Sequence, residues 1–124
     1  MSADPYSAAV RELFLHAVHG GDLPDADVVD LAGQGIRLQL AARHIDGRIE
    51  ALRFRAYACP HVIAACEAFC RGWEGRDVAD LDSFSAADII NDLTVPVEKT
   101  GRILVLEDAV RALGRSIGGG SALS

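Results

Sequence analysis

Hydrophobic and polar residues alternate along residues 36–57, on both sides of the dipeptide Asp46-Gly47. An alternation of period two predicts strands that bury one face. Asp-Gly between two such runs is a strong signal for a tight hairpin turn. The arginines of both runs fall on the opposite face, where we expect them to meet solvent. The pattern therefore predicts an antiparallel hairpin over residues 36–57.

Elsewhere hydrophobic residues recur at intervals of three and four, which predicts helices. The first predicted helix starts at Asp4-Pro5, read as a cap followed by a first-turn proline, and ends at Gly20-Gly21. His16 and His19 fall in its last turn. Two histidines three residues apart, with no third ligand nearby in the sequence, are expected to be solvated rather than to bind a metal.

Three further helices are predicted in the second half of the chain. One begins at Cys59 and closes at Gly75. A short helix follows the capping-box pattern of residues 85–88, and Val95-Pro96-Val97 breaks it. The last helix is expected to begin with Thr100 as its cap.

Residues 22–35 contain four aspartates among small residues and end in Gly33-Gln34-Gly35. We expect a solvated acidic loop here, with a short strand at Val28-Val29 within it. The aspartates lack the spacing of a calcium-binding loop.

These elements predict an α+β fold, in which helices cover one face of a small antiparallel sheet and the final helix packs across it. With 124 residues the chain is expected to form one domain, residues 1–124, in which residues 118–124 are a flexible tail.

Composition narrows the possible functions. A net charge of −6 gives no electrostatic support to nucleic-acid binding and suits a basic protein partner better. No apolar run reaches the ~20 residues that a membrane span requires. Three cysteines, an odd number, without a signal-peptide pattern at the start indicate a reducing, cytoplasmic setting rather than a disulfide framework.

Cys59 has a special place, since the alternating run ends there and the helical pattern begins. Pro60 suits the first position of a helix, so that Cys59 lies at or near the N-cap. The helix dipole and its free N–H groups favour a thiolate at this position, and a protonated His61 would add to that effect. Two interpretations stay open: a reactive thiol and a cysteine that only packs.

The other cysteines are weaker candidates. In one continuous helix Cys59 and Cys70 would lie roughly 16 Å apart, too far to share a metal ion. Cys66 and Cys70, one turn apart, would need further ligands from elsewhere, and we expect both to pack in or near the core. No phosphate-binding loop or nucleophile elbow is present, and the pair Cys59–His61 lacks an identified orienting partner, so we expect no enzymatic activity.

The order of these elements and several local motifs resemble the iron–sulfur cluster assembly scaffolds of the NifU/IscU type. Residues 57–75 align without gaps on the family's Y-G-C-x-x-x-I-A-x-S stretch and the glycine that ends its helix. Pro5-Tyr6-Ser7 resembles the family's start, and residues 95–99 resemble its proline-containing segment with a lysine. Residues 107–109 then fall in register with its last helix.

The resemblance implies a cluster site of three cysteines and a nearby aspartate or histidine. The family's first cysteine falls here at Ala32 and its aspartate at Gln34. Its final histidine and cysteine fall at Gly101 and Arg102. Only Cys59, the middle cysteine, is therefore retained, together with Lys99. One thiolate per chain does not provide the four ligands of a [2Fe–2S] centre. Arg102 would also bring a positive charge to a ligand position and help to keep Cys59 ionised if the two approach.

We therefore expect a degenerate scaffold-like protein of iron–sulfur cluster assembly. Cys59 would accept persulfide sulfur or give one ligand to a shared iron–sulfur cluster, with His61, Lys99 and Arg102 shaping its charge. The alternatives are a non-catalytic interaction protein that binds a cysteine desulfurase or a chaperone, and a variant that binds zinc. The oligomeric state stays open.

Overall fold

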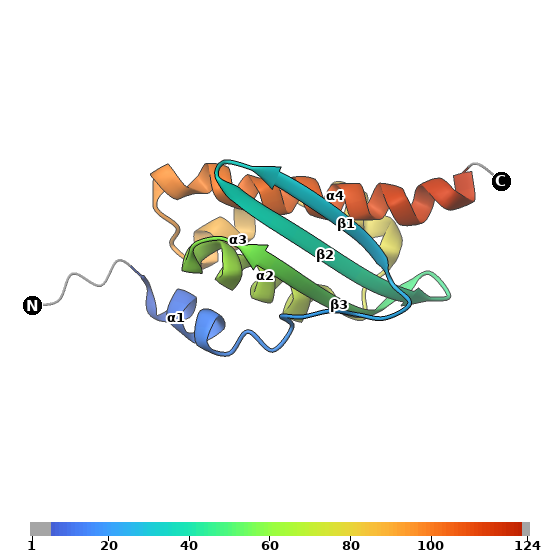
Figure 1. Cartoon of the computed structure of the whole chain (residues 1–124), viewed down its shortest axis with the longest axis horizontal. Coiled ribbons are helices and arrows are strands. Elements are labelled where there is room, and N and C mark those ends of the chain that lie inside the picture. The colour runs from blue at the N-terminus through green and yellow to red at the C-terminus, as the bar shows by residue number, and fades with distance from the viewer. Residues whose placement is uncertain (1–5, 123–124) are drawn as a thin grey trace, which may run out of the picture.

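A computed structural model describes residues 6–122 of the chain. Its helices and strands follow one another in this order (Figure 1): α1 Ala8–Leu15, β1 Asp27–Gly33, β2 Ile36–Ile45, β3 Arg48–Tyr57, α2 Pro60–Trp73, the 3-10 turn η1 Val78–Ser83, α3 Ala87–Asp92, the 3-10 turn η2 Val97–Lys99, and α4 Thr100–Ala122. The predicted α+β class is confirmed.

The three strands form one antiparallel sheet in the order β1-β2-β3. The predicted hairpin is confirmed as β2 and β3, which pair from Arg37 opposite Tyr57 to Ile45 opposite Arg48. Its turn has positive φ at both central residues, 53° at Asp46 and 78° at Gly47. This geometry belongs to the type I′ turn, whose twist matches that of the strands.

The acidic loop predicted at residues 22–35 is wrong for half of its length, although the short strand predicted at Val28-Val29 lies inside the strand found there. Residues 27–33 form β1, which pairs with β2 along all seven residues, and Gln34-Gly35 makes a second turn with positive φ at both residues. Aspartate is depleted in strands, which hid this one. The Asp30 carboxylate accepts two 3.1 Å hydrogen bonds from the Arg37 guanidinium across the sheet, which compensates for the charge.

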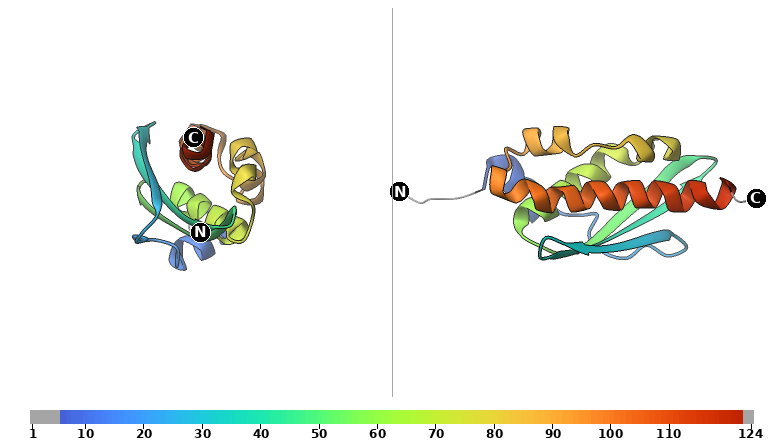
Figure 2. Two further views of the ribbon diagram at one scale, coloured as in Figure 1. Left: turned by 90° about the vertical axis from the view of Figure 1, so that its right-hand side faces the viewer. Right: turned by 90° about the horizontal axis from the view of Figure 1, so that it is seen from above.

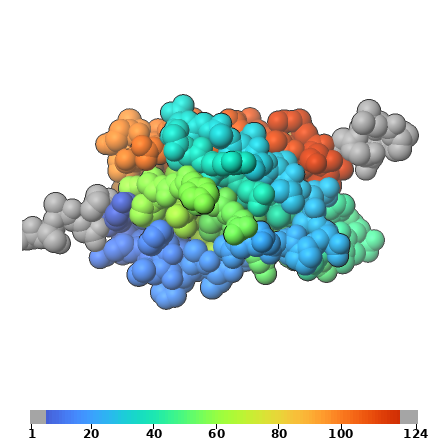
Figure 3. Space-filling model, in the orientation of Figure 1, coloured from blue at the N-terminus to red at the C-terminus, as the bar shows by residue number. Residues whose placement is uncertain are grey.

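Helices α2 and α4 lie against one face of the sheet, as predicted, and the segment with η1 and α3 lies on their far side (Figure 2). The core between these layers is apolar; its largest fully buried hydrophobic side chains are Phe69, Leu38, Leu40, Ile49, Leu52, Leu81, Ile103, Leu106, Leu113, Val10 and Val62. In the described part of the chain no helix lies over the other face of the sheet, and strand residues form the surface there (Figure 3).

Helix ends differ from the sequence prediction at four places, one of which is the end of α1 at Leu15 rather than at Gly20-Gly21. The hydroxyl of Ser7 caps α1 by accepting from the Val10 N–H, whereas Asp4 and Pro5 lie outside the described residues. The α3 cap is Ala86 rather than Ser85, although the short helix itself is confirmed. Thr100 is the first residue of α4 and its hydroxyl donates to the Val97 carbonyl, because the turn η2 leads directly into the helix.

The predicted flexible tail is helical for most of its length, since α4 continues to Ala122. Extending an existing helix adds one hydrogen bond per residue, which offsets the weak helix propensity of three glycines. Despite its length, α4 is not apolar enough to cross a membrane, and neither is any other helix within residues 6–122.

The contact between α4 and η1 predicts that Gly114→Ala destabilises the protein. An added Cβ would come within 2.9 Å of the Leu81 Cβ and 3.3 Å of the Asp82 backbone nitrogen, and neither atom can move without shifting η1. Overpacking of this kind costs about 1–3 kcal/mol in the free energy of unfolding, measurable by urea denaturation. Gly118→Ala is the matched control, because its Cβ would meet open space. Equal stability of the two variants would contradict this packing.

Candidate functional site

Cys59 stands at the corner between β3 and α2, where the sequence predicts it. It is the N-cap residue of α2, with extended backbone angles (φ −75°, ψ 165°), and Pro60 occupies the first helical position. The proline fixes its own φ and has no N–H to leave unpaired. The corner therefore directs a half-buried cysteine towards the positive end of a 14-residue helix.

The surroundings of Cys59 favour its thiolate. Burial alone would raise the pKa of the thiol, but the backbone N–H groups of Val62 and His61 and the guanidinium of Arg102 outweigh it. The net result is a pKa below the ordinary value for cysteine. No hydrogen bond of full capping geometry joins the sulfur to the helix, so the effect comes from several weaker polar contacts.

Arg102 lies in the first turn of α4, and its guanidinium is one of the groups that lower the pKa of the Cys59 thiol. Arg102 therefore lies close enough to Cys59 to affect the charge of the thiol, which the sequence alone left open. A guanidinium keeps its proton at all physiological pH values, so it is a permanent positive charge beside the thiol.

The positions that align with the family's other ligands come together in space. A Cβ added to Gly101 would lie 3.4 Å from the Gln34 side-chain oxygen, so the β1–β2 turn touches the start of α4. Ala32 pairs with Arg37, which pairs in turn with Tyr57 at the end of β3. Ala32, Gln34 and Gly101 thus lie together, but none of them has a side chain that ligates iron or zinc.

The donor set does not fit a cluster or a zinc ion held by one chain. Within residues 6–122 no three histidine, cysteine, aspartate or glutamate side chains come close enough together to hold a metal ion. A [2Fe–2S] centre takes four protein ligands, and structural zinc takes four as well. Among the site positions that the family resemblance implies, Cys59 is the one that offers a soft ligand.

His61 does not supply the positive charge that the sequence suggested. Its side chain is only 2 % exposed, and burial, followed by the nearby charge of Lys99, lowers its pKa below the ordinary histidine value. Its ring packs against Tyr6 at 4.9 Å between centroids, and its Nδ1 has no hydrogen-bond partner among residues 6–122. His61 therefore contributes its backbone N–H to the thiol, while Lys99 acts on His61.

Cys66 and Cys70 are buried in the core, as predicted. Burial raises the pKa of both thiols far above the ordinary value, with smaller contributions from negative groups such as Glu67. Both therefore stay protonated and inert at neutral pH.

Sequence reasoning did not find the exposed apolar side chains that lie at the same end of the molecule as Cys59. Tyr57 is 84 % exposed and Val97 87 % exposed. Leu104, also exposed, lines a hollow of about 610 Å³ together with Ala32, Gln34 and Gly101. The available signal was that Tyr57 and Val97 belong to no predicted core face.

Comparison with known proteins identifies the family of the chain. The family model described as the NifU-like N terminal domain matches residues 5–114. The iron sulfur cluster assembly protein 1, mitochondrial, of Eremothecium gossypii is 28 % identical over 80 residues, which cover 64 % of this chain and 52 % of that protein.

Two solved structures share the fold. The N-terminal part of a NifU-like protein from Brucella abortus superposes with a TM-score of 0.74 at 16 % identity, covering 91 % of this chain and 94 % of that one. A protein from Fervidobacterium islandicum, described as an iron–sulfur cluster assembly scaffold for the SUF system, gives 0.70 at 13 % identity, covering 88 % and 96 %. With the family model matching most of the chain, the protein belongs to the family of NifU-like N-terminal domains.

Proposed function

We propose that this chain acts in iron–sulfur cluster assembly as a scaffold-type protein whose working group is the Cys59 thiolate. The observation that carries the proposal is the contrast among the cysteines: the pKa of Cys59 is lowered, by contacts that outweigh its burial, and that of Cys66 is raised by burial. Family membership and the described role of the Fervidobacterium protein support a role in iron–sulfur cluster assembly. The chain spans about half the length of the curated relative, 52 %.

The chemical step that fits one thiolate is sulfur acceptance from a protein persulfide. The Cys59 sulfur attacks the outer sulfur of the donor's S–SH group, a new S–S bond forms, and the donor's S–S bond breaks. The donor leaves as a thiolate, and Cys59 then carries the persulfide with its hydrogen. No oxidant is consumed, because the sulfane sulfur moves between two thiols without a change in the number of S–S bonds.

Arg102 and the N-terminus of α2 have one role in this step, which is to hold negative charge at Cys59. A persulfide is ionised more readily than a thiol, so the same positive groups also suit the product. The residues at the family's ligand positions, among them Ala32 and Gly101, add no iron ligand. The chain alone therefore does not build a complete cluster, and a cluster that uses Cys59 is shared with other ligands.

A second candidate, a non-catalytic interaction protein, is favoured by the exposed side chains of Tyr57, Val97 and Leu104. Aromatic and large apolar residues are enriched in the central parts of protein interfaces. The partner in either case is a protein, with a cysteine desulfurase or a chaperone as the classes that the family suggests. In this second function Cys59 would only pack.

Alkylation separates the two functions. We expect Cys59 to react with iodoacetamide at pH 7 faster than a free model thiol, and Cys66 and Cys70 not to react in the folded protein. The pH profile of the rate should have its midpoint below the ordinary cysteine pKa of about 8.5. Mass spectrometry of the labelled peptides gives each rate. A Cys59 rate no higher than that of the model thiol would remove the reactive-thiol proposal.

Replacing Arg102 tests the origin of this reactivity. Arg102→Gln removes the fixed charge, so the pKa of Cys59 should rise and its alkylation at pH 7 should slow by about three- to tenfold. Arg115→Gln is the matched control, since Arg115 is an exposed arginine farther along the same helix. A rate unchanged in Arg102→Gln would show that the guanidinium does not act on the thiol.

Persulfide transfer tests the function itself. Incubated without oxygen with a persulfide donor, such as a persulfidated cysteine desulfurase, the protein should gain one sulfur atom, located at Cys59 by peptide mass spectrometry. Cys59→Ser should gain none, whereas Cys70→Ser should behave as wild type. Transfer to Cys66 or Cys70, or no transfer to an alkylation-competent Cys59, would contradict the sulfur-acceptor role.

A further inference from the structure

Residues 16–21, called the strap here, run from the end of α1 across α2 to the outer edge of β3. The Phe54 N–H donates to the His19 carbonyl at 3.0 Å, and the Gly21 N–H donates to the Phe54 carbonyl at 2.8 Å. The strap therefore pairs with β3 for one short stretch and covers part of its edge. Ala17, Gly20 and Gly21 also form one wall of a hollow that extends to Tyr57.

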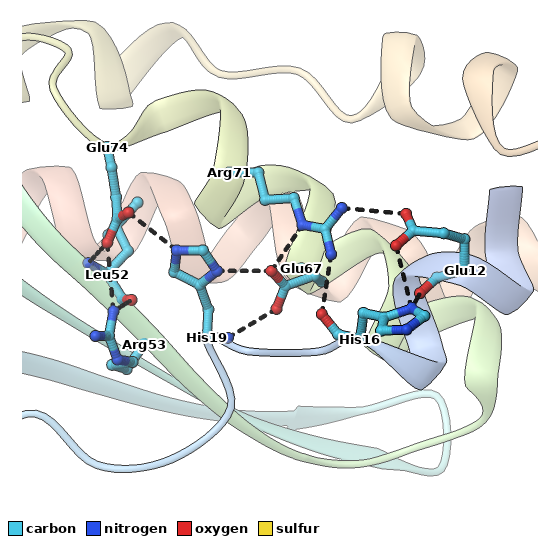
Figure 4. Close-up of polar contacts among 8 residues, drawn as sticks. All are labelled: Glu12, His16, His19, Leu52, Arg53, Glu67, Arg71 and Glu74. Atoms are coloured by element: carbon cyan, nitrogen blue, oxygen red, sulfur yellow. Dashed lines mark hydrogen bonds and ion pairs between the residues drawn. The ribbon is translucent and has the colours of Figure 1, made fainter.

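His19 fastens the strap to α2, contrary to the expectation that it is solvated (Figure 4). Its ring lies between two carboxylates, with Nδ1 2.6 Å from a Glu67 oxygen and Nε2 2.9 Å from a Glu74 oxygen. The His19 backbone N–H also donates to Glu67 at 2.9 Å. The Glu67 side chain is 0 % exposed and that of His19 13 %.

This geometry requires a doubly protonated ring. A carboxylate only accepts hydrogen bonds, so each ring nitrogen that faces one must carry a hydrogen. A neutral imidazole has a single N–H and leaves one nitrogen lone pair against a carboxylate oxygen. The two nitrogens also point to carboxylates on opposite sides of the ring, an arrangement that does not converge on a metal ion.

Of the three groups in this contact, His19, Glu67 and Glu74, the neighbouring charges leave His19 as the one that changes its protonation state over physiological pH. Each carboxylate has an arginine of its own: Arg71 lies 2.9 Å from Glu67, and Arg53 lies 3.3 Å from Glu74, which also accepts from the Leu52 N–H. Arg71 further contacts Glu12 and the His16 carbonyl on the α1 side. Within residues 6–122 the other titratable groups packed nearby include the buried thiols Cys66 and Cys70 on α2 and the exposed His16, which pairs with Glu12. Just beyond the strap, the exposed Asp22 pairs with Arg55 of β3 at 3.0 Å.

We propose that protonated His19 is a pH-dependent clasp that holds the strap on α2 and β3, and that its deprotonation loosens residues 16–21 and uncovers the edge of β3 at Phe54. The inference is independent of the function proposed for Cys59. Its consequence is local, since α1 keeps separate attachments through Val10 and Leu13 in the core and through the Ser7 hydroxyl bond to the Leu93 carbonyl.

The direction of the pH effect follows from the pKa shifts of His19 and of the two glutamates. Burial lowers the pKa of His19, but the hydrogen bonds to Glu67 and Glu74 outweigh it and the pKa is raised. The clasp is therefore complete below the ordinary histidine pKa of about 6.5 and is lost as pH rises through the raised value. The pKa of each glutamate is lowered, because its hydrogen bonds and ion pairs outweigh burial, so acid opens the clasp only well below pH 6.

Amide hydrogen exchange tests the clasp in the full chain. Between pH 6 and pH 8.5 the protection factors of the Gly21 and Phe54 amides, corrected for the intrinsic rate, should fall by at least about tenfold, while amides in the centre of α4 keep theirs. His19→Gln should show the low protection at both pH values. His16→Gln, which alters the exposed histidine of the same segment, should keep the wild-type pH dependence.

Protection of Gly21 and Phe54 that does not change with pH in the wild type would overturn the proposal, and so would an unchanged pH dependence in His19→Gln. If His19→Gln does not fold, the histidine ring signals of the wild-type protein decide. His19 should be protonated at both nitrogens at pH 6.5 and lose its proton at higher pH. A neutral His19 ring at pH 6.5 contradicts the clasp.

Discussion

The packing of α2 is the constraint on which the rest of the structure depends. Residues on most sides of this helix are buried, because it lies between the sheet, α1, α4 and the segment with α3. A helix held this way cannot shift or turn without opening the core. Its first residues, Pro60 and His61, are consequently fixed in space, and so are the N–H groups that face Cys59. The thiol owes its position to the core more than to any contact of its own.

The same helix carries two polar features, one at each end. Cys59 precedes its first turn, and His19 contacts Glu67 in its second half and Glu74 at its C-cap. In both places burial opposes ionisation, and nearby groups of opposite charge or hydrogen-bonding groups outweigh it. Such sites are stable only when every charged member has a partner. One thiolate at Cys59 meets this condition, because a fixed arginine lies next to it. Several thiolates without a bound metal ion would not meet it.

Sequence reasoning found what depends on local pattern. The alternation of residues 36–57 and the Asp46-Gly47 turn predicted the hairpin, and Pro60 predicted where α2 begins. Only the Val28-Val29 part of strand β1 was predicted, because the pairing of Asp30 with Arg37 across the sheet overrides the low strand propensity of aspartate. His19 was judged solvated because its partners, Glu67 and Glu74, lie about fifty residues away in the chain. The effect of Arg102 on Cys59 was suggested only by the family resemblance and only if the two residues approach, since no local pattern joins residues so far apart.

The central claim is that Cys59 is the one functional thiol of a site that has lost its other ligands. Iron, acid-labile sulfide and persulfide sulfur in anaerobically purified protein, measured beside Cys59→Ser and after reconstitution with iron and sulfide, test it most directly. The account predicts at most one sulfane sulfur per chain, absent from Cys59→Ser, and no stable cluster held by a single chain. A stable [2Fe–2S] cluster with three thiolate ligands from one chain would contradict it.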